Sequence, residues 1–168
     1  MKRSICCFLI LSLLLSFCGC RSSNIENPIS FYYLRKAPSF GSYDSIIAPE
    51  IVDGDEFTTI AKVLHFYLRG PDDPTLKTTF PPGTYLLDVK AAGDGLTITL
   101  SDSFASLTGV SLSLACCAIA KTAMEYSGVD SVEIRTDSAP LDGEESIIIR
   151  HADLVLYDSY DVADNNAE

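Results

Sequence analysis

Apolar side chains recur along residues 28–157 with two different periods. A period of two predicts strands near residues 29–34, 45–52, 85–91, 96–100, 129–135, 146–150 and 154–157. A period of about 3.6 predicts helices over residues 57–68 and 110–126. Two helices packed on one face of a mostly antiparallel β-sheet is the simplest packing of these parts, so the expected fold class is α+β.

The first predicted helix carries an apolar stripe made by Phe57, Ile60, Ala61, Leu64 and Leu68. Asp53 and Glu56 form an acidic analogue of the capping box, which predicts where the helix begins. Gly70 followed by Pro71 predicts its end, because glycine adopts the left-handed conformation and proline cannot continue a helix.

Phe66 projects away from that stripe, between Lys62 and Arg69. One explanation is that another part of the chain covers the ring, either the segment 44–49 or the loop after Gly70. The other is that Phe66 is an exposed anchor for a partner, flanked by cations that suit an acidic surface.

The clearest hairpin spans residues 85–100. On its first strand two sets of side chains are predicted to alternate, namely Tyr85, Leu87, Val89 and Ala91 against Leu86, Asp88 and Lys90. The return strand places Leu96, Ile98 and Leu100 on one face, and Gly93-Asp94-Gly95 supplies the turn.

Small side chains dominate one stripe of the second predicted helix, which predicts a close approach to the sheet. The stripe consists of Ser113, Cys116, Cys117, Ala120, Ala123 and Met124. Val132 and Ile134 are predicted to be buried on the strand that follows.

The amino terminus has the layout of a secretory signal, with Lys2 and Arg3 before an apolar run over residues 5–17. That run is shorter than the roughly 20 residues that span a membrane. Gly19-Cys20 resembles the bacterial lipobox, which predicts cleavage before Cys20 and acylation of its thiol. Cys18 is a second candidate for the lipid. An ordinary signal peptide cut elsewhere and an uncleaved anchor are the alternatives.

These features divide the chain into four parts. We expect a lipoprotein signal peptide over residues 1–19, a tether over 20–27, one αβ domain over 28–157 and an acidic, disordered tail over 158–168.

Charge and cysteine content narrow the possible partners. The chain carries 12 basic and 23 acidic residues, for a formal charge of −11. This argues against binding to nucleic acid or electrostatic adhesion to anionic lipids. Once the signal is removed and Cys20 acylated, only Cys116 and Cys117 remain, and such neighbours bridge only with strain, so no disulfide framework is expected.

No catalytic, cofactor or metal site is predicted. His65 is interpreted as a surface histidine, and Cys116 or Cys117 as core residues rather than nucleophiles paired with it. His151 and Asp153 share a face only if that segment is extended, and two ligands do not make a zinc site. The segments 72–73, 93–95 and 101–103 are interpreted as a solvated loop, a hairpin turn and a strand end.

Several motifs occur in an order that resembles the GerMN domain of sporulation and spore-germination proteins. They are Leu68-Arg69-Gly70-Pro71, Phe80-Pro81-Pro82-Gly83-Thr84-Tyr85-Leu86-Leu87, Leu100-Ser101 with Phe104, Ala118-Ile119 with Thr122, and Val132 with Ile134. The resemblance covers residues 59–150. It implies a non-enzymatic module on exported lipoproteins of Gram-positive bacteria, similar to small αβ domains that assemble protein complexes between membranes.

The leading hypothesis is therefore a protein held by its lipid on the outer face of the cell membrane. It would bind another envelope protein, through Phe66, and support sporulation or germination. The alternative is an envelope lipoprotein that binds a small ligand or glycan in vegetative cells.

Overall fold

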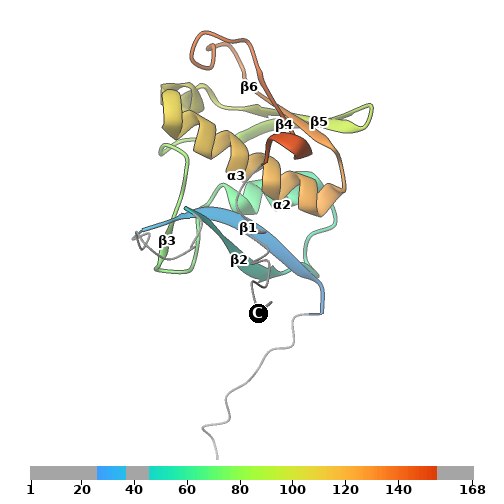
Figure 1. Cartoon of the computed structure of the whole chain (residues 1–168). Helices are drawn as coiled ribbons and strands as arrows, with labels where there is room; N and C mark the ends of the chain where they lie inside the picture. Colours follow the sequence, from blue (N-terminus) through green and yellow to red (C-terminus); the bar gives the residue numbers. More distant parts are fainter. Residues whose placement is uncertain (1–25, 37–45, 155–168) are drawn as a thin grey trace, which may run out of the picture.

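The computed structural model describes residues 26–36 and 46–154, which form two β-sheets with helices α2 and α3 between them (Figure 1). The two sheets are mostly antiparallel, so the predicted α+β class is confirmed. The sequence suggested one sheet, whereas the N-terminal strands form a sheet of their own on the other side of the helices. The predicted signal peptide, most of the tether and the acidic tail lie outside the described residues.

The smaller sheet has the strand order β2-β1-β3. Its strands are β1 (Pro28–Arg35), β2 (Ile47–Asp53) and β3 (Leu76–Lys77). The first two match the predicted strands, whereas β3 was not predicted because two residues carry no periodicity. β3 pairs only with Leu34 and Arg35, so among the described residues no strand neighbours the rest of that edge of β1.

The larger sheet has the strand order β4-β5-β6-β7. Its strands are β4 (Leu86–Ala92), β5 (Gly95–Leu100), β6 (Ser131–Thr136) and β7 (Ile147–Arg150). β5 and β6 are parallel, since the chain crosses over through α3 between them, and the other pairs are antiparallel. Val132 and Ile134 are fully buried, as predicted.

A β-bulge changes the predicted alternation on β4. The register against β5 shifts between Leu86 and Asp88, so one residue is inserted there. Leu86 is buried and Val89 packs against the core, whereas Tyr85 and Leu87 are exposed. The prediction that Tyr85, Leu87 and Val89 share one face is therefore wrong.

Helix α2 (Ile60–Tyr67) begins later than predicted. Its N-cap is Thr59, whose hydroxyl accepts a hydrogen bond from the backbone N–H of Lys62 at 3.3 Å. Asp53, predicted to cap the helix with Glu56, is instead the last residue of β2. Of the predicted stripe only Leu64 is fully buried, and Val63 and Tyr67 complete the buried face.

Helix α3 (Gly109–Ser127) packs against β1 on one side and against β6 and β7 on the other. It ends at Gly128, which has a φ of 69°. Burial on two sides explains why the apolar face is wider than the predicted stripe. Cys116, Ala120, Ala123 and Met124 are buried as predicted, whereas Ser113 is exposed and Cys117 is half-buried.

The edge of β1 that β3 leaves unpaired is hydrogen-bonded by the two helices. The N–H of Tyr32 donates to the hydroxyl of Thr122 on α3, at 3.1 Å. The C=O of Tyr32 accepts from the hydroxyl of Tyr67 on α2, at 2.7 Å. In the pairing of β1 with β2, Tyr32 lies opposite Pro49. Because the N–H and C=O of Tyr32 both point to the helices, the N–H that proline lacks would have no partner on β1, and the proline costs no hydrogen bond.

Tyr33 makes the reciprocal connection. Its hydroxyl donates to the C=O of Tyr67 at 2.8 Å, and the two rings stack with their centroids 4.9 Å apart. Burial raises the pKa of both phenols well above the usual value, so they stay protonated and remain hydrogen-bond donors.

The chain leaves β7 through a short 3-10 helix, η2 (His151–Asp153). Leu154 follows this helix and packs against the core, so it does not begin the predicted strand over 154–157. The remainder of that predicted strand lies outside the described residues. Within residues 26–36 and 46–154, no helix is both long and apolar enough to cross a membrane.

We expect Tyr67→Phe to lower the free energy of unfolding by about 1–2 kcal/mol, because the buried C=O of Tyr32 loses this donor. Thr122→Val should cost a similar amount by removing the acceptor for the N–H of Tyr32. Urea denaturation measures both. Tyr85→Phe is the matched control, since Tyr85 is 56% exposed. A Tyr67→Phe protein as stable as the wild type would show that this hydrogen bond does not hold the layers together.

Candidate partner-binding site

Four side chains of α2 and the turn after it form one stripe on the surface. They are Lys62, His65, Phe66 and Arg69, which follow the helical spacing i, i+3, i+4 and i+7. Arg69 continues the stripe beyond the helix because its N–H donates to the C=O of Phe66 at 3.0 Å. We call these four residues the α2 ridge.

Phe66 lies half-buried at the centre of the α2 ridge. Its ring makes an edge-to-face contact with Phe57, at 5.2 Å between centroids, and lies 5.9 Å from the ring of Phe31. The guanidinium of Arg69 stands over the same ring, 4.8 Å from its centroid. Phe31 and Phe57 therefore partly cover the ring, whereas one of the two explanations from the sequence named the segment 44–49 or the loop after Gly70. A role for Phe66 in partner binding stays a prediction.

The α2 ridge is electropositive in an acidic protein. No Asp or Glu occurs between Phe57 and Gly70, although the chain as a whole has a formal charge of −11. Lys62, His65 and Arg69 are exposed, and neither Lys62 nor Arg69 forms an ion pair with a residue that the structure describes. Their charges are therefore available to an acidic surface.

The two thiols lie in or beside the core, as predicted for Cys116. Cys116 is fully buried, and this burial, followed by the neighbouring Cys117, raises the pKa of its thiol to about 12. Cys117 is half-buried, and burial also raises its pKa. A thiol that stays protonated is a poor nucleophile, and His65 lies exposed on α2.

His151 and Asp153 lie in a 3-10 helix and not in an extended segment. The condition under which the two side chains would share a face is therefore not met. Asp153 instead accepts a hydrogen bond from the N–H of Arg150 at 2.9 Å. Among the described residues, no group of three or more His, Cys, Asp or Glu side chains is placed to hold a metal ion.

Asp102 has a structural role in the segment 101–103. It begins the 3-10 helix η1 (Asp102–Ser106) and accepts hydrogen bonds from the N–H groups of Ser138 and Ala139, at 2.9 and 3.1 Å. The Ser138 hydroxyl donates to the same carboxylate. These bonds lower the pKa of Asp102, with the Ser138 hydroxyl as the largest cause. The carboxylate therefore ties η1 to the loop that follows β6.

The other two loop segments behave as turns. Gly93 has a φ of 63°, which fits the first central position of the two-residue hairpin turn that links Ala92 and Gly95. The loop at Asp72 and Asp73 is held by Glu50, whose carboxylate accepts from both N–H groups at 2.9 and 2.7 Å. The sequence did not single out Glu50, because this contact depends on how β2 and the loop come together.

Comparison with known proteins identifies a sequence family. The profile of the family described as "Germane: Sporulation and spore germination" matches residues 31–142, from β1 to the turn after β6. No curated protein sequence matches the chain.

Solved structures of GerMN domains show the same fold. The first GerMN domain of the sporulation protein GerM from Bacillus subtilis is 14% identical, with a TM-score of 0.52 over 67% of this chain and 84% of that one. The tandem GerMN domains of the same protein are 21% identical, with a TM-score of 0.52 over 77% of this chain and 47% of theirs. A putative lipoprotein from Clostridium perfringens is 20% identical, with a TM-score of 0.48 over 76% of this chain and 89% of that one.

We expect the stabilising effect of Asp102 to depend on pH. Because its pKa is lowered in the folded state, the ionised carboxylate stabilises the fold above the ordinary aspartate pKa, near 4, and this stabilisation is lost as the pH falls below it. Asp102→Ala should therefore lower the melting temperature at pH 7, and the difference from the wild type should shrink toward pH 3.

Asp137→Ala is the control, because it removes an acid from the same loop and leaves the backbone that binds Asp102. Thermal melts between pH 7 and pH 3 measure the difference in melting temperature between each variant and the wild type. A difference between Asp102→Ala and wild type that is constant with pH would show that the charge of Asp102 is not the cause.

Proposed function

This chain belongs to the Germane family of sporulation and spore germination, and on that premise we propose that it is a lipid-anchored, non-enzymatic protein of the cell envelope that assembles a complex with another envelope protein during sporulation or germination. GerM-like domains are not known as enzymes. The observation that carries the proposal is the α2 ridge, a cationic and aromatic surface on an otherwise acidic protein.

The α2 ridge has the chemistry of an interface anchor. Aromatic and arginine side chains dominate the energy of protein interfaces when neighbouring groups hold them in place. Phe57 and Phe31 hold the ring of Phe66, and Arg69 is stacked on it, so little conformational entropy remains to be lost on binding. The partner that fits is a protein whose contact surface is acidic, since the positive charge here would also accelerate the encounter.

The anchor is proposed at Cys20, on the lipobox-like Gly19-Cys20 after a short apolar run. β1 begins at Pro28, so the segment 21–27 would separate the lipid from the folded domain. More than one acyl chain at the new amino terminus would hold the protein firmly, because a single chain binds membranes only marginally. The protein would then lie on the outer face of the membrane of a Gram-positive cell.

Binding of a small ligand or glycan in vegetative cells is the second candidate. It is supported by a polar depression of about 400 Å³ on the larger sheet, lined among others by Asp88, Lys90 and Arg135. That depression is formed by strands β4, β5 and β6 and by Asp137, the residue that follows β6, so it is part of the surface of the sheet. Ligand sites, in contrast, usually bury most of the ligand. The α2 ridge therefore favours a protein partner.

Replacing Cys20 with Ala should release the protein from the membrane or leave the uncut precursor there, because the acylated thiol is missing. Membrane fractionation with metabolic labelling by a fatty acid measures this. A Cys20→Ala protein that is still processed and acylated, with the label on Cys18, would contradict the assignment.

Partner binding is tested with Phe66→Ala and Lys62→Glu, returned to a strain that lacks the protein. Each variant should lower recovery of the partner by about tenfold, the usual scale for a central interface residue. Sporulation and germination efficiency should fall with it. The measurements are a pull-down from sporulating cells and spore counts.

Two controls separate folding from binding. Lys77→Glu makes the same charge change on β3, away from the α2 ridge, and should leave recovery unchanged. Thermal melting shows whether Phe66→Ala still folds, and the exposed Lys62 provides a test that does not depend on the core. Normal partner recovery with Lys62→Glu and a folded Phe66→Ala would refute the site. A deletion that slows growth but leaves spores normal would refute the role in sporulation and germination.

A further inference from the structure

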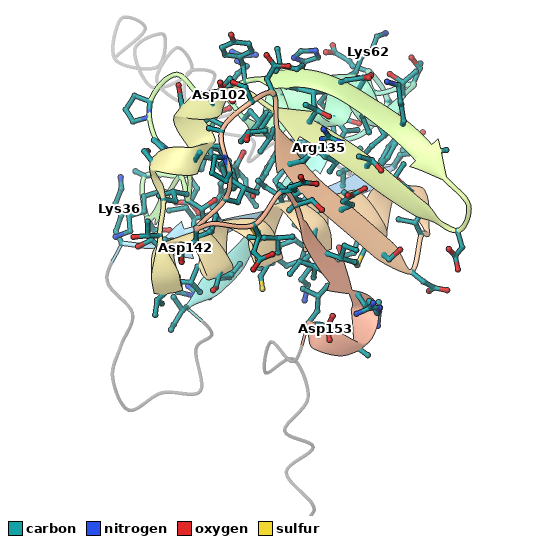
Figure 2. All side chains as sticks on the ribbon, turned by 90° about the horizontal axis from the view of Figure 1, so that it is seen from above. Lys36, Lys62, Asp102, Arg135, Asp142 and Asp153 are labelled. Atoms are coloured by element: carbon teal, nitrogen blue, oxygen red, sulfur yellow. The ribbon has the colours of Figure 1, made fainter. Side chains whose placement is uncertain are left out.

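The larger sheet has one face that no described element covers. Figure 1 shows α2 and α3 on its lower side, and Figure 2, seen from above, shows Arg135 on the side facing the viewer. On β5, Leu96, Ile98 and Leu100 point into the core, so Thr97 and Thr99 point outward. We call this side the outer sheet face.

Four charges form a rectangle on the outer sheet face. One row crosses the strands from Asp88 to Thr99 to Arg135, and the next row crosses from Lys90 to Thr97 to Glu133. Each row therefore has one acid and one base at its ends, and the order of signs reverses from one row to the other. The corners alternate in sign around a centre of two threonine hydroxyls.

Such a rectangle is complementary to itself. A half-turn about an axis parallel to β5 and midway between two facing copies places Asp88 opposite the Arg135 of the second copy and Lys90 opposite its Glu133. A half-turn about an axis across the strands places Asp88 opposite Lys90 and Arg135 opposite Glu133. Every charge meets its opposite in either arrangement, and each contact occurs twice, as in an isologous dimer.

We propose that two copies of this chain pair through their outer sheet faces, about a two-fold axis that lies between the two faces and parallel to them. This goes beyond the proposed function, because it names a second copy as a partner at a surface distinct from the α2 ridge. The four charges of the rectangle sum to zero, whereas the chain has a formal charge of −11. Copies that repel each other elsewhere can meet at this neutral surface.

Local contacts hold the rectangle in place before the copies meet. The hydroxyl of Thr97 donates to the carboxylate of Glu133 at 2.9 Å, and the ammonium of Lys90 lies 2.5 Å from the carboxylate of Asp88. Ile148 pairs with Glu133 across β6 and β7 and is 51% exposed, which adds apolar area at the end of one row. Because the contact is polar and exposed, pairing should be weak and should decrease with salt.

Cross-linking of the full chain in membranes tests the pairing. Thr99→Cys at the centre of the outer sheet face should give a dimer with a short bismaleimide at low salt. The unsubstituted chain measures the background from the native thiols. Adding Arg135→Glu should reduce the dimer by about tenfold, because two exposed ion pairs become repulsions. Lys77→Glu, with the same charge change on β3, should have no effect.

Mixing two differently tagged variants gives the decisive result. A chain with Arg135→Glu should form a mixed dimer with a chain carrying Asp88→Arg if the axis runs along β5, or with one carrying Glu133→Arg if the axis runs across the strands. Glu144→Arg changes the charge equally outside this face and should not restore pairing. Failure of both complementary mixtures, or a Thr99→Cys signal no higher than background, would overturn the proposal.

Discussion

The edge of β1 that β3 leaves unpaired is the constraint on which the arrangement of the domain depends. β3 pairs with only two residues of this strand, and the edge beyond them faces the helices. A buried backbone group without a partner is costly, so Tyr67 and Thr122 must reach Tyr32 from two different helices. Once these bonds fix α2 and α3 against β1, the larger sheet can pack on their other side. The outward direction of the α2 ridge follows from the same bonds, because Tyr67 must face inward.

Local patterns in the sequence were sufficient for most elements. Residues 29–34, 45–52 and 96–100 alternate clearly, and small residues mark the face of α3. The predicted start of α2 was wrong because two capping signals compete there, Asp53 with Glu56 and Thr59. Asp53 pairs with Pro28 and extends β2, which leaves Thr59 to cap the helix. The bulge at Leu86 was also not predictable, since an inserted residue is defined only by its partner strand.

The candidate surfaces show the same limit. The sequence placed Phe66 between two cations at helical spacing, which is a local property. Its cover by Phe31 comes from a strand far earlier in the chain, so periodicity could not reveal it. The charge rectangle depends on the register of three strands, one of which arrives by a parallel crossover. Residues 88, 90, 133 and 135 carry no signal of proximity until that register is known.

The hydrogen bond between Tyr32 and Thr122 joins residues 90 positions apart in the chain. Strands β1 and β2 precede α3 in the chain, so the edge of β1 stays unpaired until α3 has packed against it. Contacts of such long sequence separation slow folding, because the chain between the two residues must lose the entropy of loop closure before the hydrogen bond can form. During that interval the open edge can pair with a strand from another molecule. The fold of the domain can therefore be completed only when α3 is present. Pairing with another molecule is most probable after β1 and β2 have formed their hairpin and before α3 covers the edge of β1.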